Sequence, residues 1–154
     1  MFPIKKKSNC IFEIKMVALV AYLFLALFVS FLCSIMEAVL LSTPISYLKI
    51  QQENGYKWAG PFLEFKTTID KPLSAILSLN TVAHTIGAAG VGAQAVAVFG
   101  QASFGIVSAV LTLLILVITE IIPKTIGAQY WKSLSAVCYY TIRGMVVISY
   151  PLVV

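Results

Sequence analysis

The chain has 154 residues, of which 60% are hydrophobic and only 11% are charged, and its formal net charge is +5. Ordinary soluble domains carry about 25% charged residues, so a water-soluble domain of this composition could not cover its own surface. The basic residues flank apolar stretches and do not form one continuous basic face, which argues against a nucleic-acid partner and for the lipid bilayer.

The first predicted element follows a polar N-terminal lead, residues 1–15. Val17 to Met36 is a run of 20 residues without a charge, which as a helix spans the roughly 30 Å hydrocarbon core of a bilayer. The run is longer than the apolar core of a secretory signal, and no A-x-A cleavage site follows it. We therefore expect a retained transmembrane helix over about 16–41, ended by Pro44.

Residues 45–71 carry nearly all of the charge in the middle of the chain. Gly55 and the pair Gly60-Pro61 interrupt this segment. Such breaks predict two short amphipathic surface helices between the first and second spans.

The next 48 residues, Pro72 to Thr119, contain no charged side chain. As one helix they would measure roughly 72 Å, which is too long for a single crossing. We expect two crossings, about 73–99 and 104–122, joined by a tight turn at 100–103 into an antiparallel hairpin.

Residues 133–154 are long enough to cross the membrane, but Arg143 would then sit in the middle, at a cost of about 2.5–3.5 kcal/mol. Trp131 and several tyrosines in this region suit a helix that lies along the membrane interface. A fourth crossing is the alternative, and we favour a juxtamembrane belt helix over about 128–150. Residues 16–154 then form one all-α integral membrane domain with three transmembrane helices.

The orientation follows from the distribution of Lys and Arg. With three crossings, four of these residues share the side of the N-terminus and seven share the side of the C-terminus. The positive-inside rule predicts a multi-pass protein of the cell's inner (plasma) membrane with the N-terminus outside and the C-terminus in the cytoplasm.

Three crossings also place the end of the first span, the start of the second and the end of the third at one membrane face. Each of these places carries unusual polar residues: Ser34 and Glu37, then Asn80 and His84, then Glu120 with Lys124. Acids inside a membrane are costly and mark ion or substrate paths by default. Hydroxyl, amide and carboxylate oxygens are the ligands of a hard cation such as Mg²⁺. The sequence therefore predicts a cation site, and the structural alternative is that these side chains only pack, pair or bond to the backbone.

Pro123 and Gly127, which follow Glu120 in the sequence, extend this hypothesis. Pro123 cannot donate to the carbonyl of Thr119, so the third helix should kink or unwind and free carbonyls as ligands. Gly127 lets the chain turn closely and could offer its own carbonyl.

Other chemistries fit poorly. The three cysteines form no CxxC pair, and the single histidine has no cysteine beside it, so we expect no disulfide framework, thiolate site or zinc site. An enzyme would need a nucleophile and base, and the histidine has no acid spaced to orient it, so we expect no enzymatic activity. The small residues between Gly87 and Ala93 allow close helix packing, either within one protomer or between two.

Three short motifs resemble those of the CNNM/CorC (cyclin M) transmembrane domain. Residues 34–38, Ser-Ile-Met-Glu-Ala, resemble its S-x-x-E-T/A motif, and Leu79-Asn80-Thr81 resembles its G-N-x motif. Residues 120–125, Glu-Ile-Ile-Pro-Lys-Thr, resemble its E-I-x-P-K motif. The resemblance covers about residues 17–150, with the motifs in order.

The resemblance implies a homodimeric Mg²⁺ transporter that exports Mg²⁺ by coupling to an inward Na⁺ gradient. The cation ligands would be Ser34, Asn80, Glu120 and a backbone carbonyl near Gly127. Four further residues at or beside the motifs are candidates for supporting roles: Glu37, Thr81, His84 and Lys124.

Three positions depart from the family pattern: Ile35 and Thr119 replace glycines, and His84 stands where many members have asparagine. Family members usually continue into a cytoplasmic pair of CBS domains that binds ATP. No such pair is expected within these residues, and no ATP site. A non-transporting membrane anchor or regulatory module is the alternative function.

Overall fold

The computed structural model describes the backbone of residues 4–153 and the side chains of residues 13–102 and 104–149. This part of the chain is helical except for short connections and contains no strand. Three of its helical segments are long and apolar enough to cross a membrane: Glu13–Ser42, Asp70–Phe99 and Phe104–Gln129. The expected fold class, an all-α membrane domain, is confirmed.

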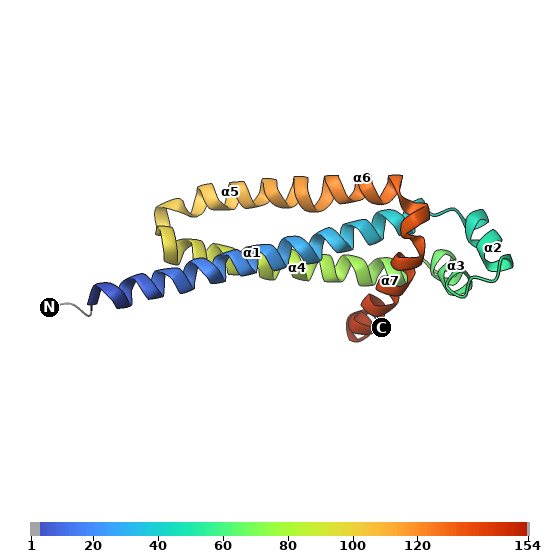
Figure 1. Ribbon diagram of the computed structural model, residues 1–154, viewed down its shortest axis with the longest axis horizontal. Coiled ribbons are helices and arrows are strands. Elements are labelled where there is room, and N and C mark those ends of the chain that lie inside the picture. The colour runs from blue at the N-terminus through green and yellow to red at the C-terminus, as the bar shows by residue number, and fades with distance from the viewer. Residues whose placement is uncertain (1–3, 154) are drawn as a thin grey trace.

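The first span belongs to α1 (Ile4–Ser42), which begins within the segment expected as a polar lead. It packs lengthwise against the second span, α4 (Asp70–Phe99) (Figure 1). Gly87 makes the close approach possible, because a Cβ at this position would collide with the Cβ of Ala26 on α1. The small residues of α4 therefore serve packing within the protomer at this point.

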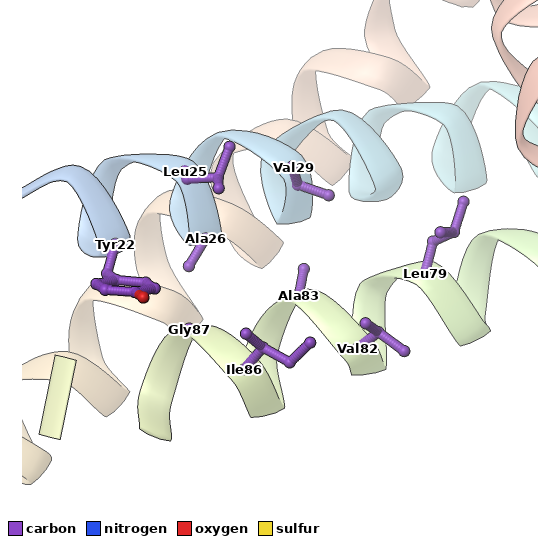
Figure 2. A pocket seen from close by; sticks show the side chains of 9 residues that line it. All are labelled: Tyr22, Leu25, Ala26, Val29, Leu79, Val82, Ala83, Ile86 and Gly87. Carbon is purple, nitrogen blue, oxygen red and sulfur yellow. The ribbon is translucent and has the colours of Figure 1, made fainter. Parts of the chain in front are cut away.

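An apolar groove of about 240 Å³ runs beside this contact (Figure 2). Its α1 wall includes Leu25 and Val29, and its α4 wall includes Leu79, Val82 and Ile86. The groove carries almost no polar surface, which suits a face that lies against acyl chains.

Two short helices, α2 (Ile45–Glu53) and α3 (Ala59–Thr67), connect α1 to α4 as expected. Lys66 on α3 links the segment formed by α2 and α3 to the first span through hydrogen bonds. Its Nζ donates hydrogen bonds to the carbonyls of Leu40 and Leu41, each at 2.7 Å. The last carbonyls of a helix have no partner within the helix, and a cation there also complements the helix dipole. Partial burial lowers the pKa of Lys66.

We predict that Lys66→Met destabilises the fold although it keeps most of the apolar stem. The two carbonyls lose a charged donor, so the free energy of unfolding should fall by about 1–2 kcal/mol. Thermal unfolding in detergent measures the change. Lys57→Met is the matched control, because Lys57 is exposed and has no partner among the described residues. An equal melting temperature for the two variants would contradict the anchoring role.

A tight turn joins the second and third spans. Gly100 has φ 85°, a left-handed conformation that favours glycine, and a 3₁₀ turn (η1, Gln101–Ser103) follows it. The third span then consists of α5 (Phe104–Leu114), a π-helical segment η2 (Ile115–Ile121) and α6 (Ile122–Gln129).

The third span runs through Pro123 to Gln129, beyond the expected end near residue 122. The expected irregularity before Pro123 is present as a π-helical segment, and the helix does not break there. A π-turn shifts each hydrogen bond by one residue, which lets the helix continue past a residue that has no N–H.

The final helix, α7 (Trp131–Val153), turns away from α6 and lies across the end of the bundle, steeply inclined to the three spans (Figure 1). One face of α7 is buried against the bundle and includes Cys138, Tyr139 and Ile142. Arg143 is exposed, and its Nη1 donates to the hydroxyl of Tyr139 at 3.3 Å. This arrangement supports the belt helix over a fourth crossing.

Candidate cation site

The C-terminal end of α1, the N-terminal end of α4 and the η2–α6 segment lie at the same end of the bundle, next to α7 (Figure 1). This is the arrangement that three crossings require. The polar residues predicted on these segments therefore share one region of the molecule.

A buried hydroxyl, that of Ser30 on α1, lies at the centre of the polar contacts between the spans. Its Oγ is 2.8 Å from Oδ1 of Asn80, contacts Nε2 of His84, and is 3.0 Å from Oγ1 of Thr119. Asn80 and His84 come from α4, spaced one helical turn apart, and Thr119 comes from η2. One serine thus joins all three spans.

This group, which we call the Ser30 cluster (Ser30, Asn80, His84 and Thr119), is joined by contacts that all involve the Ser30 hydroxyl. Thr119 donates its own hydroxyl proton to the carbonyl of Ile115 at 2.7 Å, so it accepts from Ser30. Ser30 shares its one proton between Asn80 and Thr119, and His84 then acts as a donor through Nε2. The contacts of the Ser30 hydroxyl therefore form without a bound ion.

Ser34 lies one helical turn from Ser30, towards the end of α1 that meets α7. It is fully buried, and its hydroxyl has no hydrogen-bond partner among the described residues. A buried hydroxyl without a partner costs about 1–3 kcal/mol. Such a group in a native fold requires an explanation, and its oxygen atom could bind a hard cation.

Glu120 directly follows Thr119 and lies in the π-helical segment. It is partly buried, and no hydrogen bond or ion pair joins it to another described residue. Lys124 does not neutralise it, because Lys124 pairs with Glu37, with 3.2 Å between Nζ and Oε2. π-Helical segments often occur at functional sites, and an intramembrane carboxylate without a partner marks an ion path by default.

The other predicted residues take different positions. Gly127 is buried where α6 crosses α1, and a Cβ there would lie 2.9 Å from the carbonyl oxygen of Ile35. Thr81 is exposed and donates to the carbonyl of Leu77 in its own helix, so it does not join the cluster. Burial raises the pKa of the Cys138 thiol to about 12, which keeps that sulfur protonated and unsuited to bind metals.

Two residues of the cluster, Ser30 and Thr119, were not among the predicted site residues. Ser30, Ser34 and Glu37 are spaced i, i+4, i+7 and so share one face of α1, and this periodicity could have found Ser30. Among the described residues no three Asp, Glu, His or Cys side chains converge. A cation here would therefore be held mainly by neutral oxygens and one carboxylate.

Comparison with known proteins gives the family. Residues 21–154 match the family described as cyclin M transmembrane N-terminal domain. The chain belongs to the cyclin M transmembrane domain family. A UPF0053 protein of Synechocystis sp. is 32% identical over 138 residues, which is 90% of this chain and 40% of the relative. A UPF0053 protein of Haemophilus influenzae is 30% identical over 109 residues, 71% of this chain and 25% of the relative.

This cyclin M domain thus spans less than half the length of the curated relatives that it matches. The family and the three apolar spans make it part of a multi-pass membrane protein.

Proposed function

We propose that this chain is the membrane domain of a divalent-cation transporter and that Mg²⁺ is the transported ion. One observation carries the proposal. The carboxylate of Glu120 and the buried hydroxyl of Ser34, neither of which has a partner among the described residues, both lie within one helical turn of the contact between Ser30 and Thr119. Two oxygen atoms from different spans that lack hydrogen-bond partners among the described residues, in the same region of the bundle, are the expected features of a cation site.

The donor chemistry favours Mg²⁺. The oxygens of Ser34, Asn80 and Glu120 are hard ligands, and backbone carbonyls near Gly127 could add to them. Mg²⁺ takes about six oxygens and keeps some of its water, so a few protein oxygens are enough. The imidazole of His84 is engaged by Ser30, and it supports the site without serving as a ligand.

The remaining elements of the function follow the family resemblance and the charge distribution. We propose export of Mg²⁺ coupled to Na⁺ entry across the plasma membrane, with the C-terminus in the cytoplasm and CBS domains in a region that follows this membrane domain. We also propose a homodimer, because the small residues Ala88, Ala89 and Ala93 of α4 remain exposed in the protomer. Glu37 and Lys124 would hold α1 and α6 together at the mouth of the site.

A membrane anchor or regulatory module is the second candidate. The hydrogen bonds of the Ser30 cluster favour it, because interhelical bonds of this kind can hold helices in register without any ion. The two candidates differ in what they expect of Ser34 and Glu120, whose oxygens would have no role in an anchor.

A pair of serine variants tests the proposal. Ser34→Ala removes a buried hydroxyl without a partner, so the unliganded protein should be as stable as the native chain or more stable. If Ser34 binds Mg²⁺, the thermal stabilisation by Mg²⁺ should weaken and Mg²⁺ flux from loaded proteoliposomes should fall at least about tenfold.

Ser149→Ala is the matched control. Ser149 on α7 is the other buried hydroxyl without a partner among the described residues, and it belongs to none of the predicted ligands. Its loss should leave the Mg²⁺ response unchanged. Equal Mg²⁺ responses in the two variants would remove Ser34 from the site, and no Mg²⁺ flux in the native chain would reject the transporter.

A further inference from the structure

Ser30 holds together the two segments that present the proposed ligands. It is fully buried, as is Thr119, so their 3.0 Å contact lies inside the bundle. Through Asn80 it contacts the ligand-bearing face of α4, and through Thr119 it contacts the residue next to Glu120. Among the described residues, no other side-chain hydrogen bond joins either segment to α1 at this depth.

We propose that Ser30 is a positioning residue for the cation site. Its hydroxyl fixes the orientation of the Asn80 amide and the distance between α1 and η2, and it thereby sets the spacing of the oxygens of Ser34, Asn80 and Glu120. This inference rests on the proposed function, because it assigns Ser30 a role in the affinity of that same site.

The contacts explain why Ser30 positions the ligands and is not one itself. Its oxygen already lies within bonding distance of three polar atoms, whereas the hydroxyl of Ser34 has no such partner among the described residues. A hydroxyl has one proton and two lone pairs, and these contacts occupy the Ser30 proton and one of its lone pairs, so Ser30 is less available to a cation than Ser34. Ser30 therefore orients the ligands of the site, whereas Ser34 can bind the ion.

The π-helical segment η2 explains why Glu120 would need Ser30 to hold it in position. π-Turns are strained relative to α-helix and persist where tertiary contacts hold them. Thr119 lies within this segment, and it is bonded both to the preceding turn and to Ser30. Without Ser30, the position of Glu120 would depend on helix packing alone.

Three variants and a matched control test the inference in the full chain. Ser30→Ala removes the central hydroxyl, and Thr119→Val removes one of its partners while keeping the shape of the side chain. The double variant shows whether the two act through one bond. Thr112→Val is the control, because Thr112 lies on the same span and bonds to its own helix at 2.9 Å, but it is exposed and outside the cluster.

Two readouts are measured for each protein. The first is the apparent dissociation constant for Mg²⁺ from thermal stabilisation. The second is the ¹⁵N imidazole spectrum of His84 in the absence of Mg²⁺, which is unambiguous because the chain contains one histidine. A general loss of packing would lower the melting temperature without a selective effect on either readout.

We expect Ser30→Ala to raise the apparent Mg²⁺ dissociation constant about 10- to 100-fold, as for other residues that orient metal ligands, and to move the His84 signal. Thr119→Val should give a smaller change in the same direction, the double variant no more than Ser30→Ala, and Thr112→Val none. If Ser30→Ala does not fold, the apparent Mg²⁺ dissociation constants and His84 signals of Thr119→Val and Thr112→Val are compared instead.

The outcomes separate this inference from the proposed function. Native Mg²⁺ affinity in both Ser30→Ala and Thr119→Val would overturn the positioning role while the transporter stands. An unmoved His84 signal in Ser30→Ala would also overturn it. No Mg²⁺ stabilisation of the native chain would reject the proposed function, and a moved His84 signal would then support Ser30 as the organiser of the cluster alone.

Discussion

Replacing Glu120 with glutamine is expected to reduce Mg²⁺ flux through the chain by roughly 100-fold, which corresponds to about 2.7 kcal/mol of lost cation binding. Glutamine keeps the size of the side chain and one oxygen, but it removes the charge. The carboxylate has no partner among the described residues, so the substitution should not destabilise the unliganded fold. A loss of flux at unchanged stability would identify Glu120 as a ligand.

Glu64→Gln is the matched control for this experiment. Glu64 lies on α3 and is exposed, so its replacement makes the same chemical change outside the spans. Flux should be measured over a range of Mg²⁺ concentrations, because a lost ligand raises the half-saturating concentration. Saturation curves that coincide for native protein, Glu120→Gln and Glu64→Gln would show that the Glu120 carboxylate takes no part in transport.

Much of the fold could be predicted because the charges of this chain are so unevenly placed. The uncharged run Pro72 to Thr119 requires two crossings, and Gly100 supplies the turn between them. Likewise, the break at Gly55 separates the two short helices, whereas the expected break at Gly60-Pro61 is absent because both residues lie in the first turn of α3, where proline is tolerated. These features depend on the cost of charge in hydrocarbon and on local backbone freedom, both of which a sequence displays directly.

The end of the third span could not be predicted in the same way. Pro123 normally ends or kinks a helix, and nothing in the local sequence indicates that a π-turn will accommodate it. In the structure η2 packs against α1, and the contacts include the bond from Ser30 to Thr119, which are 89 residues apart in the sequence. A short-range pattern does not contain that information.

The sequence could predict which end of the bundle carries the candidate site, but not which side chains contact one another within it. Helix topology alone places Asn80 and Glu120 at one end of the bundle. It does not distinguish Ser30 from Ser34, which occupy the same face of α1 one turn apart. The structure separates them by their contacts, since the Ser30 hydroxyl contacts three polar side chains and the Ser34 hydroxyl has no partner among the described residues.

Gly127 lies where α6 closely approaches α1. Gly127→Ala should lower the free energy of unfolding by about 1–3 kcal/mol, because its new Cβ would lie 2.8 Å from the Cβ of Ala38 and 2.9 Å from the carbonyl oxygen of Ile35. The second contact is with backbone, which cannot rotate away as a flexible side chain could. The two helices must therefore separate, although alanine by itself favours a helix over glycine.

Gly144→Ala provides the contrast, because a Cβ at this position on α7 meets nothing within 4 Å. There the intrinsic preference for alanine acts alone, and stability should rise by roughly 0.5–1 kcal/mol. Thermal unfolding of both variants in detergent should show a lower melting temperature for Gly127→Ala and a higher one for Gly144→Ala than for the native chain. Because α6 continues from the segment that carries Glu120, the separation forced by Gly127→Ala should also weaken Mg²⁺ stabilisation, whereas Gly144→Ala should not. A stable Gly127→Ala protein with native Mg²⁺ affinity would show that the contact between α1 and α6 does not set the geometry of the site.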